Sequence, residues 1–94
     1  MLFVVIARFR KGAEERRKDL VGPFTHHLGQ RQPRLRLGGP LKAEDGAQAG
    51  VFYIAESDSR DAVEALVHDS PYYKADLYDT IDITRMDLEL GSMN

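Results

Sequence analysis

The sequence predicts an α+β domain in which a four-stranded antiparallel sheet carries two main helices on one face. Three observations lead to this fold class. Segments rich in β-branched and aromatic residues alternate with segments whose apolar residues recur every three or four positions. Clusters of glycine, proline and serine separate these segments and divide the 94 residues into about six elements. Since the sequence contains no repeat and no low-complexity linker, we expect residues 1–94 to form a single domain.

The N-terminal third of the chain predicts a strand followed by a helix. Residues 2–9 are rich in β-branched and aromatic residues, and both faces of this strand are apolar. Residues from Ala13 to about Gln30 have helical spacing. We expect Pro23 to kink this helix or to divide it into two, because proline lacks the N–H that a helix interior needs. The charged run at residues 14–18 is interpreted as a solvated helix face.

The middle of the chain predicts two strands joined by a loop. Residues 34–41 alternate between arginine and leucine, so we expect Leu35 and Leu37 on one face of a second strand. An Asp-Gly pair marks the loop at residues 43–49. Residues 50–56 form a third strand that is apolar on both faces, like the first.

A second helix, one further helical turn and a fourth strand complete the predicted fold. The helix runs from a cap at Asp58 or Ser59 to about His68. Residues 71–77 contribute the further turn, and residues 78–88 form the last strand. The resulting order, β-α-β-β-α-β, is that of the ferredoxin-like fold.

The apolar character of the first and third strands predicts a homodimer. An isolated antiparallel sheet with helices on one face would show polar residues on its other face. The first and third strands do not, and the sequence contains no further helix to cover them. A second copy of the chain is the simplest cover. We therefore expect the helix-free sheet faces of two copies to pack together.

Composition and charge exclude several classes of function. The formal net charge is −2, whereas a nucleic-acid binder is normally basic overall or on one face. No apolar run approaches the roughly 20 residues of a membrane span. The chain has no cysteine, and the adjacent His26 and His27 direct their side chains apart, which argues against a metal site. We expect a cytoplasmic protein that uses no metal or cofactor and binds neither nucleic acid nor membranes.

Three stretches of the sequence resemble a known family. The first is the strand that ends in Gly38-Gly39-Pro40-Leu41, the second is the helix that runs into Ser70-Pro71-Tyr72-Tyr73, and the third is the closing strand around Ile81-Asp82-Ile83. With the first strand, they resemble the YCII-related (YciI-like) domain family, and the resemblance covers nearly the whole chain.

This resemblance implies a fold, an assembly and a candidate site. It implies a ferredoxin-like domain that dimerises in the manner of a dimeric α/β barrel, with two sheets face to face. It also implies a His–Asp pair, formed by a histidine on the first helix and the aspartate before the Pro-aromatic pair. Some relatives with this domain act as small-molecule dehydrochlorinases.

The sequence departs from the family pattern at both members of this pair. Ser70 stands directly before Pro71, and the carboxylate of Asp69 lies one residue earlier. The histidines lie closer to Gly39 than the family histidine does, and an ungapped count from Gly39 places Phe24 or a neighbour at that position.

Two classes of function follow from these residues. In the first, the protein is an enzyme of isomerase or lyase type that transfers a proton on a small organic acid. His27 is the candidate proton-transfer group, with His26 as the second candidate, and Asp69 is its candidate partner. In the second, the protein is a non-catalytic dimeric module that binds a small ligand or another protein in the same cleft.

Five further residues are candidates for binding the substrate. Arg36 could meet a carboxylate, and the turn at Gly39 and Pro40 could border the cleft. Ser70 could cap the turn that follows it, and Tyr72 could offer both a ring and a hydroxyl to a ligand.

Overall fold

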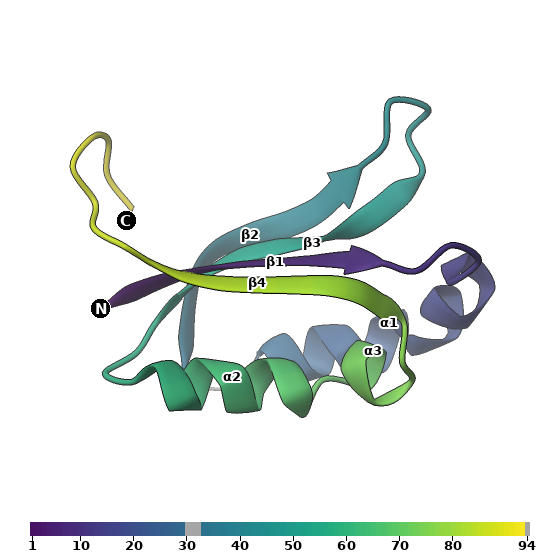
Figure 1. Ribbon diagram of the computed structural model, residues 1–94, viewed down its shortest axis with the longest axis horizontal. Helices are drawn as coiled ribbons and strands as arrows, with labels where there is room; N and C mark the ends of the chain where they lie inside the picture. The colour runs from purple at the N-terminus through teal and green to yellow at the C-terminus, as the bar shows by residue number, and fades with distance from the viewer. Residues whose placement is uncertain (30–32, 94) are drawn as a thin grey trace.

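The computed structural model describes residues 1–29 and 33–93 and confirms the predicted element order (Figure 1). The helices and strands are β1 (Leu2–Phe9), α1 (Glu14–Leu28), β2 (Arg34–Lys42), β3 (Gln48–Glu56), α2 (Arg60–His68), α3 (Pro71–Lys74) and β4 (Tyr78–Met86). The predicted end of the first helix at Gln30 lies outside the described residues.

The four strands form one antiparallel sheet in the order β2-β3-β1-β4. Figure 1 shows α1, α2 and α3 together on one side of this sheet. The fold is therefore the predicted ferredoxin-like α+β arrangement. In the described part of the chain, no helix is long and apolar enough to cross a membrane.

The hydrophobic core lies between the sheet and the helices. Alternate residues of the two central strands, among them Val5 and Ala55, face the helices and are fully buried. They pack against Val63 and its neighbours on α2. The hydroxyl oxygen of Ser59 caps this helix by accepting a hydrogen bond from the Ala62 N–H at 3.1 Å, as one of the two predicted caps would.

The opposite face of the sheet is also apolar. Val4 and Ile6 of β1 lie beside Ile54 and Phe52 of β3 in the strand register, and the helices do not cover this face (Figure 1). Leu37 of β2 pairs with Ile54 and is 45% exposed. The sheet thus carries a continuous apolar face on which Leu37 is exposed, Val4, Ile6 and Phe52 are half-buried, and Ile54 is buried.

Two local predictions need correction. Of the two outcomes expected at Pro23, the division of the helix is wrong, because α1 runs as one element from Glu14 to Leu28, while the kink stays a prediction. Pro23 has no N–H to donate to the carbonyl of Asp19, but its fixed φ is compatible with a helix. Because Asp19 and Pro23 are both exposed, water can hydrogen-bond to that carbonyl instead.

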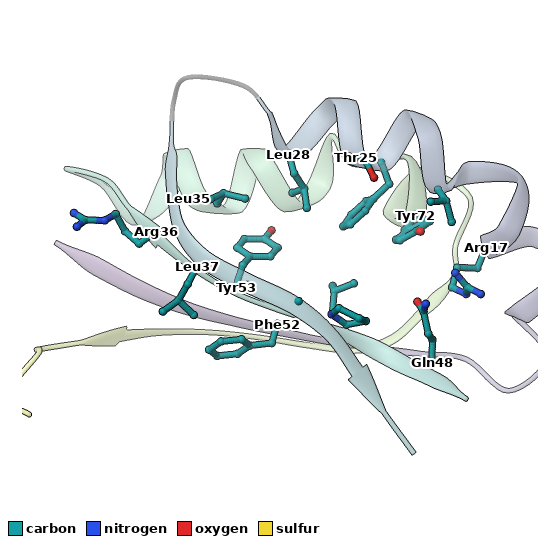
Figure 2. A pocket seen from close by; sticks show the side chains of 16 residues that line it. Arg17, Thr25, Leu28, Leu35, Arg36, Leu37, Gln48, Phe52, Tyr53 and Tyr72 are labelled. Atoms are coloured by element: carbon teal, nitrogen blue, oxygen red, sulfur yellow. The ribbon is translucent and has the colours of Figure 1, made fainter. Parts of the chain in front are cut away.

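The second correction concerns the faces of β2. Leu35 pairs with Ala55 and Leu37 pairs with Ile54, so a β-bulge at Arg36 places the two leucines on opposite faces of the sheet. Figure 2 shows Leu35 directed toward the helices and Leu37 directed away from them. Simple alternation along the strand could not reveal the extra residue.

Candidate functional site

A cavity of about 410 Å³ lies between α1 and the β2–β3 hairpin. Most of its wall is apolar or aromatic, and Gly38 and Gly39 contribute backbone without side chains. The apolar and aromatic lining residues include Val21, Phe24, Leu28, Leu35, Val51, Tyr53 and Tyr72. Figure 2 shows Leu28, Leu35, Tyr53 and Tyr72 around this space. Its volume falls within the usual range of small-molecule sites, roughly 300–1,000 Å³.

Stacked aromatic rings form one side of the cavity. The rings of Phe24 and Tyr72 are nearly parallel, with centroids 4.0 Å apart, and Phe9 meets Tyr72 edge-on at 5.4 Å. Tyr72 is placed by the short helix α3, whose N-cap Ser70 accepts a hydrogen bond from the Tyr73 N–H at 3.1 Å. A flat wall of this kind suits a flat ligand, because aromatic faces stack with an offset.

One end of the cavity is polar. Figure 2 shows Arg17, Gln48 and Tyr72 at this end, opposite Leu35. The Arg17 side chain is only 8% exposed, and its guanidinium donates two hydrogen bonds to the Glu14 carboxylate, at 2.7 and 3.2 Å. The hydrogen bond from Arg17 holds the pKa of Glu14 below its usual value and raises the pKa of Arg17 in turn.

The tyrosines of the wall are held in their neutral form. Burial raises the pKa of Tyr72, and the nearby guanidinium of Arg17 opposes that effect without reversing it. Burial alone raises the pKa of Tyr53 far above its usual value. At neutral pH both hydroxyls therefore act as hydrogen-bond donors and acceptors and not as anions.

Four of the five predicted binding residues line the cavity: Arg36, Gly39, Pro40 and Tyr72. The guanidinium of Arg36, however, donates to Glu56 Oε1 at 2.8 Å and to the Met93 carbonyl at 2.6 Å, and Figure 2 shows it pointing away from the space. Ser70 is buried next to the wall and positions Tyr72 through its cap.

The structure places the predicted acid–base residues outside this wall. His27 is buried, and its Nε2 lies 2.7 Å from the carbonyl oxygen of Leu66 on α2. Because a carbonyl oxygen only accepts, Nε2 carries a proton and donates. His26 is exposed, and Asp69 is an exposed residue that caps the end of α2. The His27–Asp69 pair stays a prediction.

Arg17 is the residue of the site that sequence reasoning missed. The prediction of a fully solvated face at residues 14–18 is wrong at this position, since Arg17 is buried. Arg17 lies four residues after Ala13, three before Leu20 and seven before Phe24, which is the spacing of the inward helix stripe. This spacing indicated that Arg17 faces inward, but the charge of its side chain favoured an interpretation as a solvated residue.

A metal-ligand cluster is not part of this site. Within residues 1–29 and 33–93, no three histidine, aspartate or glutamate side chains lie together as a metal site would need. The polar groups available in the wall come from Arg17, Gln48, the Thr25 hydroxyl and the tyrosine hydroxyls.

The fold and the cavity define a ferredoxin-like domain with a pocket of small-molecule size. The protein belongs to the YCII-related domain family, whose model matches residues 1–87. No protein of curated function matches this chain.

Two solved structures show how the fold compares. One is 5-chloro-2-hydroxyhydroquinone dehydrochlorinase (TftG) from Burkholderia phenoliruptrix AC1100, in complex with 2,5-dihydroxybenzoquinone. It is 26% identical in sequence, with 93% of this chain and 94% of that chain covered and a TM-score of 0.86. The other is Rv0793 from Mycobacterium tuberculosis, 23% identical, with 98% of this chain and 100% of that chain covered and a TM-score of 0.58. The second likeness concerns the fold alone.

Proposed function

We propose that the protein is an enzyme that binds a small planar organic molecule between α1 and the β2–β3 hairpin and transfers a proton on it. The observation that carries this proposal is the cavity, with its flat aromatic side and one polar end. TftG is a dehydrochlorinase and was solved with a flat quinone ligand, which supports a ring-shaped substrate. Removal of HCl from a ring is an elimination, so we assign the reaction to the lyase or isomerase type.

We assign the proton transfer to Tyr72. Its ring lies in the wall, and its hydroxyl carries a proton at neutral pH, which it can share with or donate to a substrate oxygen or ring carbon as negative charge develops there. The alternative is the His27–Asp69 pair, since His27 lies one helical turn from Phe24 on α1. Tyr72→Phe and His27→Gln distinguish the two, because the first keeps the stacked ring and the second keeps an N–H donor for Leu66.

Titration with 2,5-dihydroxybenzoquinone tests whether the cavity is a ligand site. We expect saturable binding at one site per chain, measured by calorimetry. Thr25→Trp should abolish binding because Thr25 lines the cavity and an indole there would fill it. Lys18→Trp is the matched control, since Lys18 is exposed on the same helix and is not part of the wall. Absence of saturable binding, or unchanged binding by Thr25→Trp, contradicts the proposal.

A non-catalytic binding module is the second candidate function, and one observation favours it. The described part of the cavity wall contains no carboxylate and no imidazole. Phe24 also occupies the wall near the position where the family resemblance implies a histidine. This function predicts ligand binding without turnover. Chloride release from 5-chloro-2-hydroxyhydroquinone, followed with an ion-selective electrode, separates the two, since only the enzyme releases chloride above the rate in buffer.

We also propose that the protein is a homodimer that associates through the helix-free face of the sheet. The support is the apolar surface formed there by Val4, Ile6, Leu37, Phe52 and Ile54. An apolar face that continues across three strands and is only partly covered within one chain is typical of an interface. Sedimentation equilibrium at micromolar concentration should give twice the chain mass, and a stable monomer under those conditions would contradict the proposal.

A further inference from the structure

We propose that Arg17 and Tyr72 form an oxyanion-binding subsite at the polar end of the cavity, and that the ligand is a ring-sized organic anion. A carboxylate or an enolate oxygen of the ligand would lie against these two side chains. The inference rests on the proposed function, because it names the chemical class of the ligand for the same cavity.

The burial of Arg17 is the first argument. A charge withdrawn from water is costly unless it is paired and hydrogen-bonded, and surface arginines ordinarily keep their guanidinium in solvent. Here the side chain is 8% exposed and lines a cavity whose other walls are mainly apolar. The neighbouring Arg16, by contrast, is exposed. The fold therefore holds one specific arginine at the polar end of the cavity.

The second argument is the number of donors on the guanidinium. An arginine has five N–H groups in a fixed fork. Glu14 accepts two of them, from Nε and Nη2. Tyr72 lies close enough to contribute to the raised pKa of Arg17. Three N–H groups are not taken by Glu14, and an oxygen anion is the partner to which such donors bind most strongly.

The third argument is the position of the Tyr72 hydroxyl beside Arg17. Burial raises the pKa of Tyr72, so the hydroxyl keeps its proton at neutral pH and can donate it to an acceptor. Arg17 and Tyr72 thus present N–H and O–H donors side by side at the end of the cavity (Figure 2). Convergent donors in a site screened from water are the usual arrangement for binding an oxyanion.

Arg36 does not compete for this role. The sequence assigned it to a substrate carboxylate, but its guanidinium is engaged by Glu56 and by the Met93 carbonyl.

Glu14 sets the charge of the subsite, because its carboxylate neutralises part of the charge of Arg17 and holds the guanidinium in place. The pair provides directed donors with little net charge, which favours a weakly hydrated organic anion over a free inorganic one.

The test uses two ligands of nearly the same shape. One is 2,5-dihydroxybenzoquinone, whose hydroxyl groups are vinylogous acids that ionise below neutral pH. The other is 2,5-dimethyl-1,4-benzoquinone, in which methyl groups replace the hydroxyls and no proton can be lost. Arg17→Met should weaken binding of the first about 10- to 100-fold, the usual effect of removing a hydrogen bond to a charged group. Binding of the second should change less than about threefold.

Three further variants make the test independent of folding defects. Arg16→Met is the matched control and should leave both affinities unchanged, since Arg16 is exposed and lies outside the cavity wall. Tyr72→Phe keeps the stacked ring and should weaken anion binding roughly tenfold. Glu14→Gln should strengthen anion binding, because it removes the carboxylate that partly neutralises Arg17.

The outcomes separate this inference from the proposed function. If neither quinone binds the wild-type protein, the proposed function fails and this inference fails with it. If both quinones bind the wild type equally well, or if folded Arg17→Met and Tyr72→Phe keep full affinity for the anion, the cavity remains a ligand site but the oxyanion subsite is rejected. Tighter anion binding by Glu14→Gln together with weaker binding by Arg17→Met supports it.

Discussion

Two adjacent glycines of β2 allow a direct test of how the cavity wall is built. A Cβ atom added at Gly38 would lie 2.7 Å from both the Phe52 carbonyl oxygen and the Tyr53 Cβ. A Cβ added at Gly39 would meet nothing within 4 Å. The atoms that Gly38→Ala would displace belong to the backbone and to the root of a side chain, so they cannot move aside without shifting β3.

The expected stabilities of the two variants follow from these distances. Both substitutions restrict the unfolded chain, which stabilises the protein by about 0.4–1 kcal/mol where the new residue fits. Gly39→Ala should show this small gain. Gly38→Ala adds overpacking, which typically costs about 1–3 kcal/mol. The two variants should therefore differ by roughly 1–3 kcal/mol, or roughly 4–24 °C in melting temperature for a domain of this size.

Urea unfolding followed by far-ultraviolet circular dichroism measures this difference directly. Ligand affinity provides a second readout, because Tyr53 lies in the cavity wall and Gly38→Ala would displace it. Gly38→Ala should bind 2,5-dihydroxybenzoquinone more weakly than Gly39→Ala does. If the two variants unfold at the same urea concentration, the close packing of β2 on β3 at this position is not as described.

Three further predictions concern pH, assembly and the histidine. Burial raises the pKa of Tyr53 and Tyr78, so above about pH 10 the unfolded chain loses their protons first and stability falls by about 1.4 kcal/mol per pH unit for each. Urea titrations in alkaline buffers should show this slope, reduced in Tyr53→Phe and unchanged in the exposed control Tyr73→Phe. Phe52→Glu should give a folded monomer by sedimentation, since the substitution places a charge on the helix-free face. His27→Gln should bind ligand and retain turnover if Tyr72 transfers the proton, whereas loss of turnover with intact binding would favour the histidine pair.

Local physical chemistry accounts for what could be predicted from the sequence. Strand periodicity in β1 and β4, the serine that caps α2 and the Ser-Pro pair that begins α3 depend on neighbouring residues only. The apolar character of both faces of β1 and β3 likewise indicated a second surface to be covered. Of the candidate site, Gly39, Pro40 and Tyr72 were predicted, and the structure places all three around one cavity.

Tertiary structure decided the remainder, because these features depend on atoms far apart in the sequence. The bulge at Arg36 exists only in relation to β3, and it turns Leu37 to the opposite face from Leu35. Arg17 is buried because α3 brings Tyr72 and β3 brings Gln48 to the start of α1, at separations of 55 and 31 residues along the chain. His27 is likewise directed to α2 by the Leu66 carbonyl, which no local pattern specifies. A helical spacing shows which residues share a face, but whether that face meets solvent, a core or a cavity is determined by the elements that pack against it.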